Sequence, residues 1–226
     1  MATHLITGAG SGIGALLAGR LLERGDDLIL LARSAERAAE LAAAFDGACT
    51  VVADLAEAGS LDSLELPETL DSVVHAAGVV DLGPVSDLSA GSWTHQLQVN
   101  LVAPAALTRR ALPGLRAAGG TVVFVNSGAG LTAHPQWSAY AASKHGLKAL
   151  ADALRGEEAE HGVRVSTVYP GRTATPMQAK VHEQEGKTYV AADWIDPQTV
   201  AAAILHVLDL PRDATIPDMM VRPGPG

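Results

Sequence analysis

The chain has 226 residues, of which 48% are hydrophobic, and a formal net charge of −9 from 16 basic and 25 acidic side chains. This length and apolar content predict one domain, residues 1–226, with a full hydrophobic core. The acidic balance argues against a nucleic-acid partner, and because no segment has the pattern of a membrane span or a signal peptide, we expect a cytoplasmic protein that binds no membrane.

A glycine-rich loop follows the first predicted strand, His4–Thr7, and apolar residues at helical spacing come directly after it. Glycine lets a backbone approach a ligand closely, and the N–H groups and dipole at a helix start attract a pyrophosphate. We therefore predict phosphate binding rather than a simple tight turn, although the spacing differs from the G-x-G-x-x-G of ordinary Rossmann proteins. The loop residues assigned to the cofactor are Gly8, Gly10, Ser11, Gly12, Ile13 and Gly14.

The next two predicted strands end in residues that suit the adenosine half of a nicotinamide dinucleotide. Arg33 and Ser34 follow the strand Asp27–Ala32, where an NAD-binding protein would place an acid on the ribose hydroxyls. They suit a 2′-phosphate instead, which favours NADP(H) over NAD(H) unless Arg33 is only an exposed helix residue. Asp54, followed by Leu55 at the end of the third strand, is assigned either to the adenine amino group or to capping the next short helix.

Residues 72–78 predict a fourth, buried strand that ends on glycine, so that Ala77 and Gly78 can contact the cofactor. His75 lies within this apolar run and is expected to be a core histidine whose hydrogen bonds are satisfied. Strands alternate with helices over the whole stretch. The pattern predicts an α/β fold with a doubly wound parallel sheet of the Rossmann type, about seven strands with helices on both faces.

A long helical pattern from Ser92 to Ala118 is interrupted by Pro104. Proline removes the hydrogen bond to the carbonyl four residues earlier and usually bends a helix, which frees the carbonyl of Asn100. We expect Asn100 to lie beside the helix that carries Tyr140, where its carbonyl and amide could hold a water that passes protons to Lys144. The alternative is a helix that only bends around the core.

Ser127 and the stretch Tyr140-Ala141-Ala142-Ser143-Lys144 carry the predicted chemistry. Ser127 ends a fifth strand, where ligands bind in open α/β sheets, and its hydroxyl can donate to a substrate carbonyl. In a helix over residues 138–155, Tyr140 and Lys144 share one face, so the ammonium can lower the pKa of the phenol and make it a general acid or base. The alternative is a chance Tyr-x-x-x-Lys in an alanine-rich helix.

Other kinds of site are not expected. Ser127 lacks the Gly-x-Ser-x-Gly context of a serine hydrolase, and His134 and His145 lack the spacing of metal ligands. Cys49 is the one cysteine, and its place in an apparent strand predicts a small packed side chain rather than a reactive one.

The last third of the chain is predicted to close the site. A sharp turn after the sixth strand, residues 162–169, is expected beneath the nicotinamide, with residues 176–194 as an irregular, mobile lid or a cover for the core. A helix over residues 196–208 and an edge strand over 216–221 follow. The turn residues assigned to the cofactor are Pro170, Gly171, Thr173 and Thr175. The lid, together with Leu82, Leu131, His134 and Trp137, predicts a mainly apolar substrate pocket.

Taken together, these motifs resemble the classical short-chain dehydrogenase/reductase family over nearly the whole chain. The resemblance is carried by Thr7-Gly8-x-x-x-Gly12-Ile13-Gly14, Asp54, Ala77-Gly78, Asn100, Ser127, Tyr140-x-x-x-Lys144 and Pro170-Gly171. It implies hydride transfer between a nicotinamide nucleotide and a carbonyl or alcohol. Tyr140 would exchange the proton, Ser127 would orient the substrate oxygen, Lys144 would lower the tyrosine pKa and bind the nicotinamide ribose, and Asn100 would hold the relay water.

The resemblance also implies a homodimer or homotetramer. One departure is Ala76, which stands where the family usually has asparagine before Ala-Gly; such His-Ala-Ala-Gly strands look like those of ketoreductase modules. We therefore predict an NADP(H)-dependent oxidoreductase for a small-molecule carbonyl or alcohol, working as a reductase. An NAD-dependent alcohol dehydrogenase and a nucleotide-sensing regulatory protein without turnover stay open, but a sensor would be expected to lose Ser127, Tyr140 or Lys144.

Overall fold

The computed structural model describes residues 1–224 and contains one seven-stranded sheet in the order β3-β2-β1-β4-β5-β6-β7. All neighbouring strands are parallel. The strands are β1 (Thr3–Thr7), β2 (Asp27–Ala32), β3 (Cys49–Val52), β4 (Ser72–His75), β5 (Thr121–Val125), β6 (Arg164–Pro170) and β7 (Asp218–Val221). The order reverses between β1 and β4, which confirms the predicted doubly wound fold of the Rossmann type.

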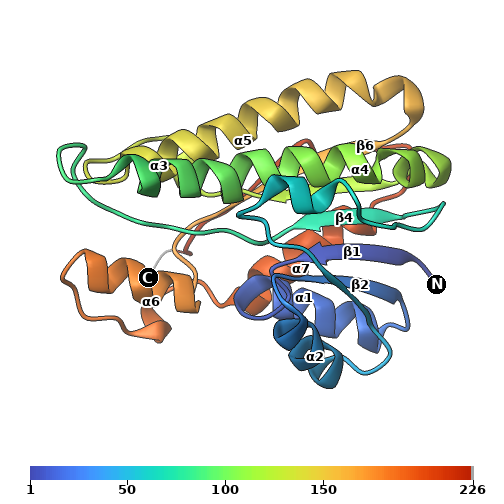
Figure 1. The fold of residues 1–226 in the computed structure, drawn as a ribbon, viewed down its shortest axis with the longest axis horizontal. Coiled ribbons are helices and arrows are strands. Elements are labelled where there is room, and N and C mark those ends of the chain that lie inside the picture. Colours follow the sequence, from blue (N-terminus) through green and yellow to red (C-terminus); the bar gives the residue numbers. More distant parts are fainter. Residues whose placement is uncertain (225–226) are drawn as a thin grey trace.

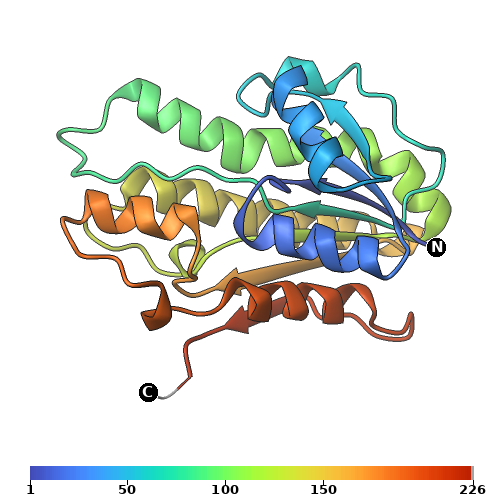
Figure 2. The same cartoon turned by 90° about the horizontal axis from the view of Figure 1, so that it is seen from below.

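Helices cover both faces of the sheet, with α3, α4 and α5 on one face and α1, α2 and α7 on the other (Figures 1 and 2). The helices are α1 (Gly12–Glu23), α2 (Ala35–Ala44), α3 (Ala90–Leu97), α4 (Ala103–Ala118), α5 (Ser138–Glu157), α6 (Pro176–Gln184) and α7 (Pro197–Leu208). Short 3₁₀ turns join some of them. None of the helices in this part of the chain is long and apolar enough to cross a membrane.

Each face of the sheet has its own apolar core, because successive strand side chains point to opposite faces. Phe124 of β5 packs with Leu107 of α4 and Leu147 of α5. Its neighbour Val123 packs on the other face with Leu17 of α1. Full burial of such a side chain stabilises the fold by about 1.5–3 kcal/mol. The two cores fix the sheet rigidly between the helix layers.

The carboxyl ends of the central strands lie at one edge of the sheet. Thr7 of β1 pairs with Leu31 of β2 and with His75 of β4, and His75 in turn pairs with Phe124 of β5. The loops after these strands therefore emerge together, although they are far apart in the sequence. As expected, His75 is a satisfied core histidine: its ring stacks on Phe124, and its Nε2 lies 2.9 Å from the hydroxyl oxygen of Thr108.

The predicted interruption of the long helix takes the form of a π-helical turn, Gln98–Val102, between α3 and α4. Pro104 lies in the first turn of α4 and is buried there. Proline has no N–H to continue the regular hydrogen-bond ladder, and the wider π turn absorbs the break. Asn100 lies in this turn and faces α5, as expected.

Two expectations are corrected. Residues 176–194 are not irregular throughout, because α6 occupies Pro176–Gln184, with Thr175 accepting from the Gln178 N–H as its N-cap. Threonine at the cap and proline in the first turn are helix-start signals that the weak apolar periodicity of this segment obscured. Cys49 is exposed rather than packed, because it begins β3, an edge strand of the sheet.

Candidate active site

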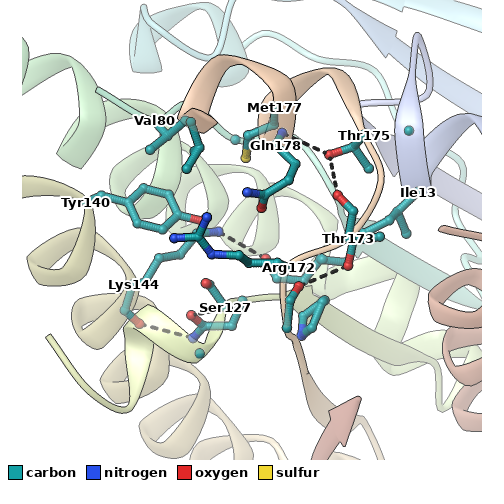
Figure 3. A pocket seen from close by; sticks show the side chains of 18 of the residues that line it. Ile13, Val80, Ser127, Tyr140, Lys144, Arg172, Thr173, Thr175, Met177 and Gln178 are labelled. Atoms are coloured by element: carbon teal, nitrogen blue, oxygen red, sulfur yellow. Dashed lines mark hydrogen bonds between the residues drawn. The ribbon is translucent and has the colours of Figure 1, made fainter. Parts of the chain in front are cut away.

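Two adjoining cavities open at the carboxyl ends of the strands. The first has a volume of about 410 Å³ and is called here the Tyr140 cavity (Figure 3). The second, of about 450 Å³, is called the Arg33 cavity. They share Gly8, Ser11, Ala77 and Gly78 in their walls. The two cavities therefore form one cleft at the switch point between β1 and β4, where open α/β sheets bind their ligands.

The glycine loop forms the wall common to both cavities. Gly8 has φ +76°, and a Cβ there would lie 2.6 Å from the backbone nitrogen of Ala77, so only glycine fits. Gly12, at φ +55°, packs against Thr175, with 3.2 Å between its Cβ position and the threonine methyl. Ser11 precedes α1 without capping it through its side chain. The first N–H groups of α1 thus remain for an anion, and the loop fits a pyrophosphate.

Arg33, Asp54 and Leu55 line the Arg33 cavity, together with a residue that the sequence reasoning missed, Arg37. The signal for Arg37 was its position four residues after Arg33, one turn into the predicted helix. Ser34 is not among the residues lining this cavity. Its hydroxyl accepts from the Arg37 N–H as the N-cap of α2, at 3.3 Å.

Asp54 has the capping role that the sequence offered, and its assignment to the adenine stays a prediction. One carboxylate oxygen accepts from the N–H of Ala56 at 2.9 Å, which caps the turn that follows β3. The residue also forms part of the cavity wall. A carboxylate has more acceptor sites than this one bond uses, so the capping contact leaves room for a ligand donor.

Tyr140 and Lys144 lie one turn apart on the buried face of α5, and both line the Tyr140 cavity with Ser127 (Figure 3). Ser127 follows β5, and its hydroxyl accepts from the Ala129 N–H at 3.2 Å. The ammonium of Lys144 donates to the Val125 carbonyl at 3.0 Å. The structure thus brings together the three residues that the sequence assigned to chemistry, from two elements that are adjacent in space.

The electrostatics of this group differ from the expectation. Burial raises the pKa of Tyr140 to about 12, with a smaller lowering effect from the Ser127 hydroxyl. Burial lowers the pKa of Lys144 to about 8. The Lys144 ammonium stands 5.8 Å from the Tyr140 ring centre and is turned to the Val125 carbonyl. In this arrangement desolvation, rather than the lysine charge, dominates the pKa of the phenol.

Asn126 is a second residue that the sequence reasoning missed. It is buried between β5 and α5, donates to the Lys144 carbonyl at 3.0 Å and accepts from the Ser127 N–H at 2.8 Å. One side chain therefore fixes the backbone at both Ser127 and Lys144. A polar residue ending an otherwise apolar strand was the available signal.

Asn100 connects the π turn to the cofactor side of the cleft. Its amide oxygen accepts from the Val79 N–H at 2.8 Å, and its amide nitrogen donates to the Val79 carbonyl at 2.9 Å and to the Ser143 hydroxyl at 3.0 Å. The amide is thus engaged with protein groups, contrary to the expectation that it would help to hold a water. These bonds, with one from the Ala77 N–H to the Thr7 hydroxyl, fix the strand end that has Ala76 in place of asparagine.

The substrate side of the Tyr140 cavity is less apolar than predicted. His134 and Trp137 line it, but Leu82 and Leu131 do not. Leu131 is exposed, and Leu82 packs against the small apolar cluster that contains Tyr140. Within residues 1–224, no three His, Cys, Asp or Glu side chains gather in a way that could hold a metal ion.

Two arginines that the sequence reasoning did not single out also line this cavity, Arg172 and Arg222. Arg172 donates to both carboxylate oxygens of Glu185, at 3.0 and 2.6 Å. Its guanidinium also lies over Trp137 and Trp194, with its central carbon 5.8 and 5.4 Å from the ring centres. Arg222 follows β7 and is exposed. Neither position carries a local motif that would have revealed it.

Comparisons with known proteins agree with this geometry. The model of a family described as short chain dehydrogenase matches residues 2–186. A Bos taurus protein named dehydrogenase/reductase SDR family member 7B is 31% identical, over 97% of this chain and 74% of that one. A solved short-chain dehydrogenase/reductase family oxidoreductase from Burkholderia thailandensis is 34% identical, covers 98% of this chain and 91% of that one, and has a TM-score of 0.83. A variant of actinorhodin polyketide ketoreductase, solved with NADPH, is 26% identical with a TM-score of 0.86, over 98% and 95% of the two chains.

Proposed function

The chain belongs to the short-chain dehydrogenase family of oxidoreductases, and on that premise we propose that it reduces a small-molecule carbonyl to an alcohol with NADPH. One observation carries the proposal: Tyr140, Ser127 and Lys144 line the same cavity as the glycine loop. A candidate proton donor and a loop suited to phosphate thus line one cavity. The NADPH found in the actinorhodin ketoreductase structure supports the choice of cofactor class.

The cleft fits such a cofactor along its length. The glycine loop and the free N–H groups of α1 would hold the pyrophosphate, and Asp54 would meet the adenine. Arg33 and Arg37 would bind the 2′-phosphate that distinguishes NADPH from NADH. Lys144, the Pro170–Gly171 turn, Thr173 and Thr175 border the end of the cleft where the nicotinamide would lie. When bound there, the cofactor supplies the hydride.

Three side chains that line the Tyr140 cavity would act on the proton or on the substrate oxygen: Tyr140, Ser127 and Lys144. Tyr140, with its pKa raised to about 12 by burial, stays protonated at neutral pH and donates its proton to the substrate oxygen as that oxygen gains negative charge. Ser127 donates to the same oxygen and orients it. Lys144 would add a positive charge close to the Tyr140 ring, with its ammonium 5.8 Å from the ring centre.

The test uses NADPH with deuterium at the transferred position, together with a broad panel of aldehydes and ketones. We expect deuterium in the alcohol product and NADPH consumption that exceeds NADH consumption. NADPH binding without deuterium transfer to any carbonyl would contradict the proposal and favour the nucleotide-sensing alternative. Equal rates with NADH and NADPH would contradict only the assignment of Arg33 and Arg37 to the 2′-phosphate, and the reductase proposal would stand.

A further inference from the structure

The Tyr140 cavity concentrates positive charge in an acidic protein. Lys144, Arg172 and Arg222 line it with His134, and none of the lining residues in the described part of the chain is an aspartate or glutamate. The whole chain has a net charge of −9, so this composition is not a reflection of the average surface. Lys144 has a role in the proposed function, but the two arginines have none.

Arg222 differs from Arg172 in that no carboxylate of residues 1–224 forms an ion pair with it. Its Nη1 lies 2.9 Å from the Cβ position of Gly128, the residue after Ser127, which places the guanidinium beside the backbone that follows Ser127. Its one hydrogen bond is a weak contact of 4.0 Å to the sulfur of Met220. Among residues 1–224, no carboxylate approaches it within the 4.0 Å of an ion pair. Within the described residues its charge is therefore not balanced by a carboxylate, although the side chain lines the cavity.

Arg172 has a different role, although it lines the same cavity. Its charge is balanced by Glu185, whose pKa is lowered by that contact, and two tryptophans hold its guanidinium. Figure 3 shows its side chain extending across the cavity on the side of Tyr140. A guanidinium fixed in this way forms a rigid wall and still has N–H donors that Glu185 does not use. It forms part of the cavity wall, and its charge is already balanced by Glu185.

We propose that the substrate is an oxo acid, whose carboxylate binds Arg222 while its carbonyl oxygen meets Ser127 and Tyr140. The inference rests on the proposed reductase function and names its substrate class. A guanidinium fork matches a carboxylate with two parallel hydrogen bonds, which a neutral ketone does not offer. In the reaction the carbonyl carbon gains a hydride from NADPH, the oxygen gains the proton of Tyr140, and the carboxylate is unchanged.

The experiment compares short 2-oxo and 4-oxo acids with their methyl esters, in the wild type and in Arg222→Gln. We expect the wild type to prefer an acid over its ester, and Arg222→Gln to lower kcat/KM for that acid about 10- to 100-fold, through KM, while the ester is unaffected. Arg222→Lys should keep part of the activity on the acid. Arg109→Gln, which removes an exposed charge outside the cavity, is the matched control and should change neither rate.

Two results would overturn the inference: equal or better turnover of the esters by the wild type, or an equal loss for acid and ester in Arg222→Gln. If the wild type reduces neither the acids nor the esters, the broad carbonyl panel tests the reductase proposal separately, and ligand binding tests the role of Arg222. Calorimetric titration of the NADPH-bound protein with 2- and 4-hydroxybutyrate should then show binding that weakens at least about 10-fold in Arg222→Gln. No binding, or equal binding to both proteins, would show that Arg222 does not hold a carboxylate.

Discussion

The two ends of the cleft differ in how far their functional side chains are buried. In the Tyr140 cavity, Tyr140 and Lys144 are only 5% and 4% exposed, and Asn126 fixes the backbone at Lys144 and Ser127. In the Arg33 cavity, Arg33 is exposed at a helix start and Arg37 pairs with Glu40 at the surface. At the first end burial raises the pKa of Tyr140 and lowers the pKa of Lys144. Changes there should alter the chemistry, whereas changes at the other end should alter only the choice of ligand.

The largest expected effect is the loss of the phenol at the buried end. Tyr140→Phe should lower kcat about 10²- to 10⁴-fold, the usual contribution of a positioned acid, and leave NADPH binding intact. Carbonyl reduction and NADPH fluorescence titration measure the two quantities. Tyr169→Phe is the matched control, because Tyr169 is also buried but does not line the cavity. A similar loss in both variants would show that the effect is structural.

The burial of Lys144 should appear in the pH dependence of stability. Its pKa is about 8 in the folded protein and 10.5 as a free side chain, so between these values the unfolded chain binds more protons. Stability linked to this group therefore rises with pH in that window. The free energy of unfolding of the wild type, relative to Lys144→Met, should increase by about 2–3 kcal/mol between pH 7.5 and 10.

Chemical denaturation at several pH values measures this difference. Contributions that do not depend on pH, such as the change in apolar packing, cancel because only the change with pH is compared. If the difference in free energy of unfolding between the wild type and Lys144→Met did not vary with pH, the burial of Lys144 would not lower its pKa. The two ends of the cleft would then differ less than the structure indicates.

At the exposed end the expected effects are smaller and depend on the cofactor. Arg33→Gln and Arg37→Gln should each raise KM for NADPH about 10-fold, the scale of one charge-assisted bond, and leave KM for NADH and kcat unchanged. Steady-state kinetics with both cofactors test this. An equal loss with NADH would mean that the arginines support the loop rather than a 2′-phosphate.

The fold and the buried end were largely predictable from the sequence because both depend on local pattern. Apolar strands and glycine spacing fix the order of elements, and Tyr140 and Lys144 are related by one helical turn. Asn126 and Arg222 were not predictable, since their roles arise from long-range contacts: Asn126 bonds to a carbonyl eighteen positions later, and Arg222 reaches Gly128 from the end of the last strand. Arg172 and Arg222 bring positive charge to the Tyr140 cavity, and the local sequence does not show that they line it. The sequence analysis therefore expected an apolar pocket.

The smallest expected effect concerns Ser34, which either caps a helix or binds the cofactor at the exposed end of the cleft. The sequence assigned it to the 2′-phosphate, but its hydroxyl caps α2 by accepting from the Arg37 N–H. Ser34→Ala should therefore lower the free energy of unfolding by about 1 kcal/mol, the usual loss for an N-cap, with KM for NADPH nearly unchanged. Ser34→Asp, which keeps the cap but adds a negative charge, should restore stability while raising KM for NADPH more than for NADH, because the new charge repels a phosphate held by Arg33 and Arg37. A rise in KM for NADPH in Ser34→Ala without loss of stability would instead return Ser34 to the cofactor site.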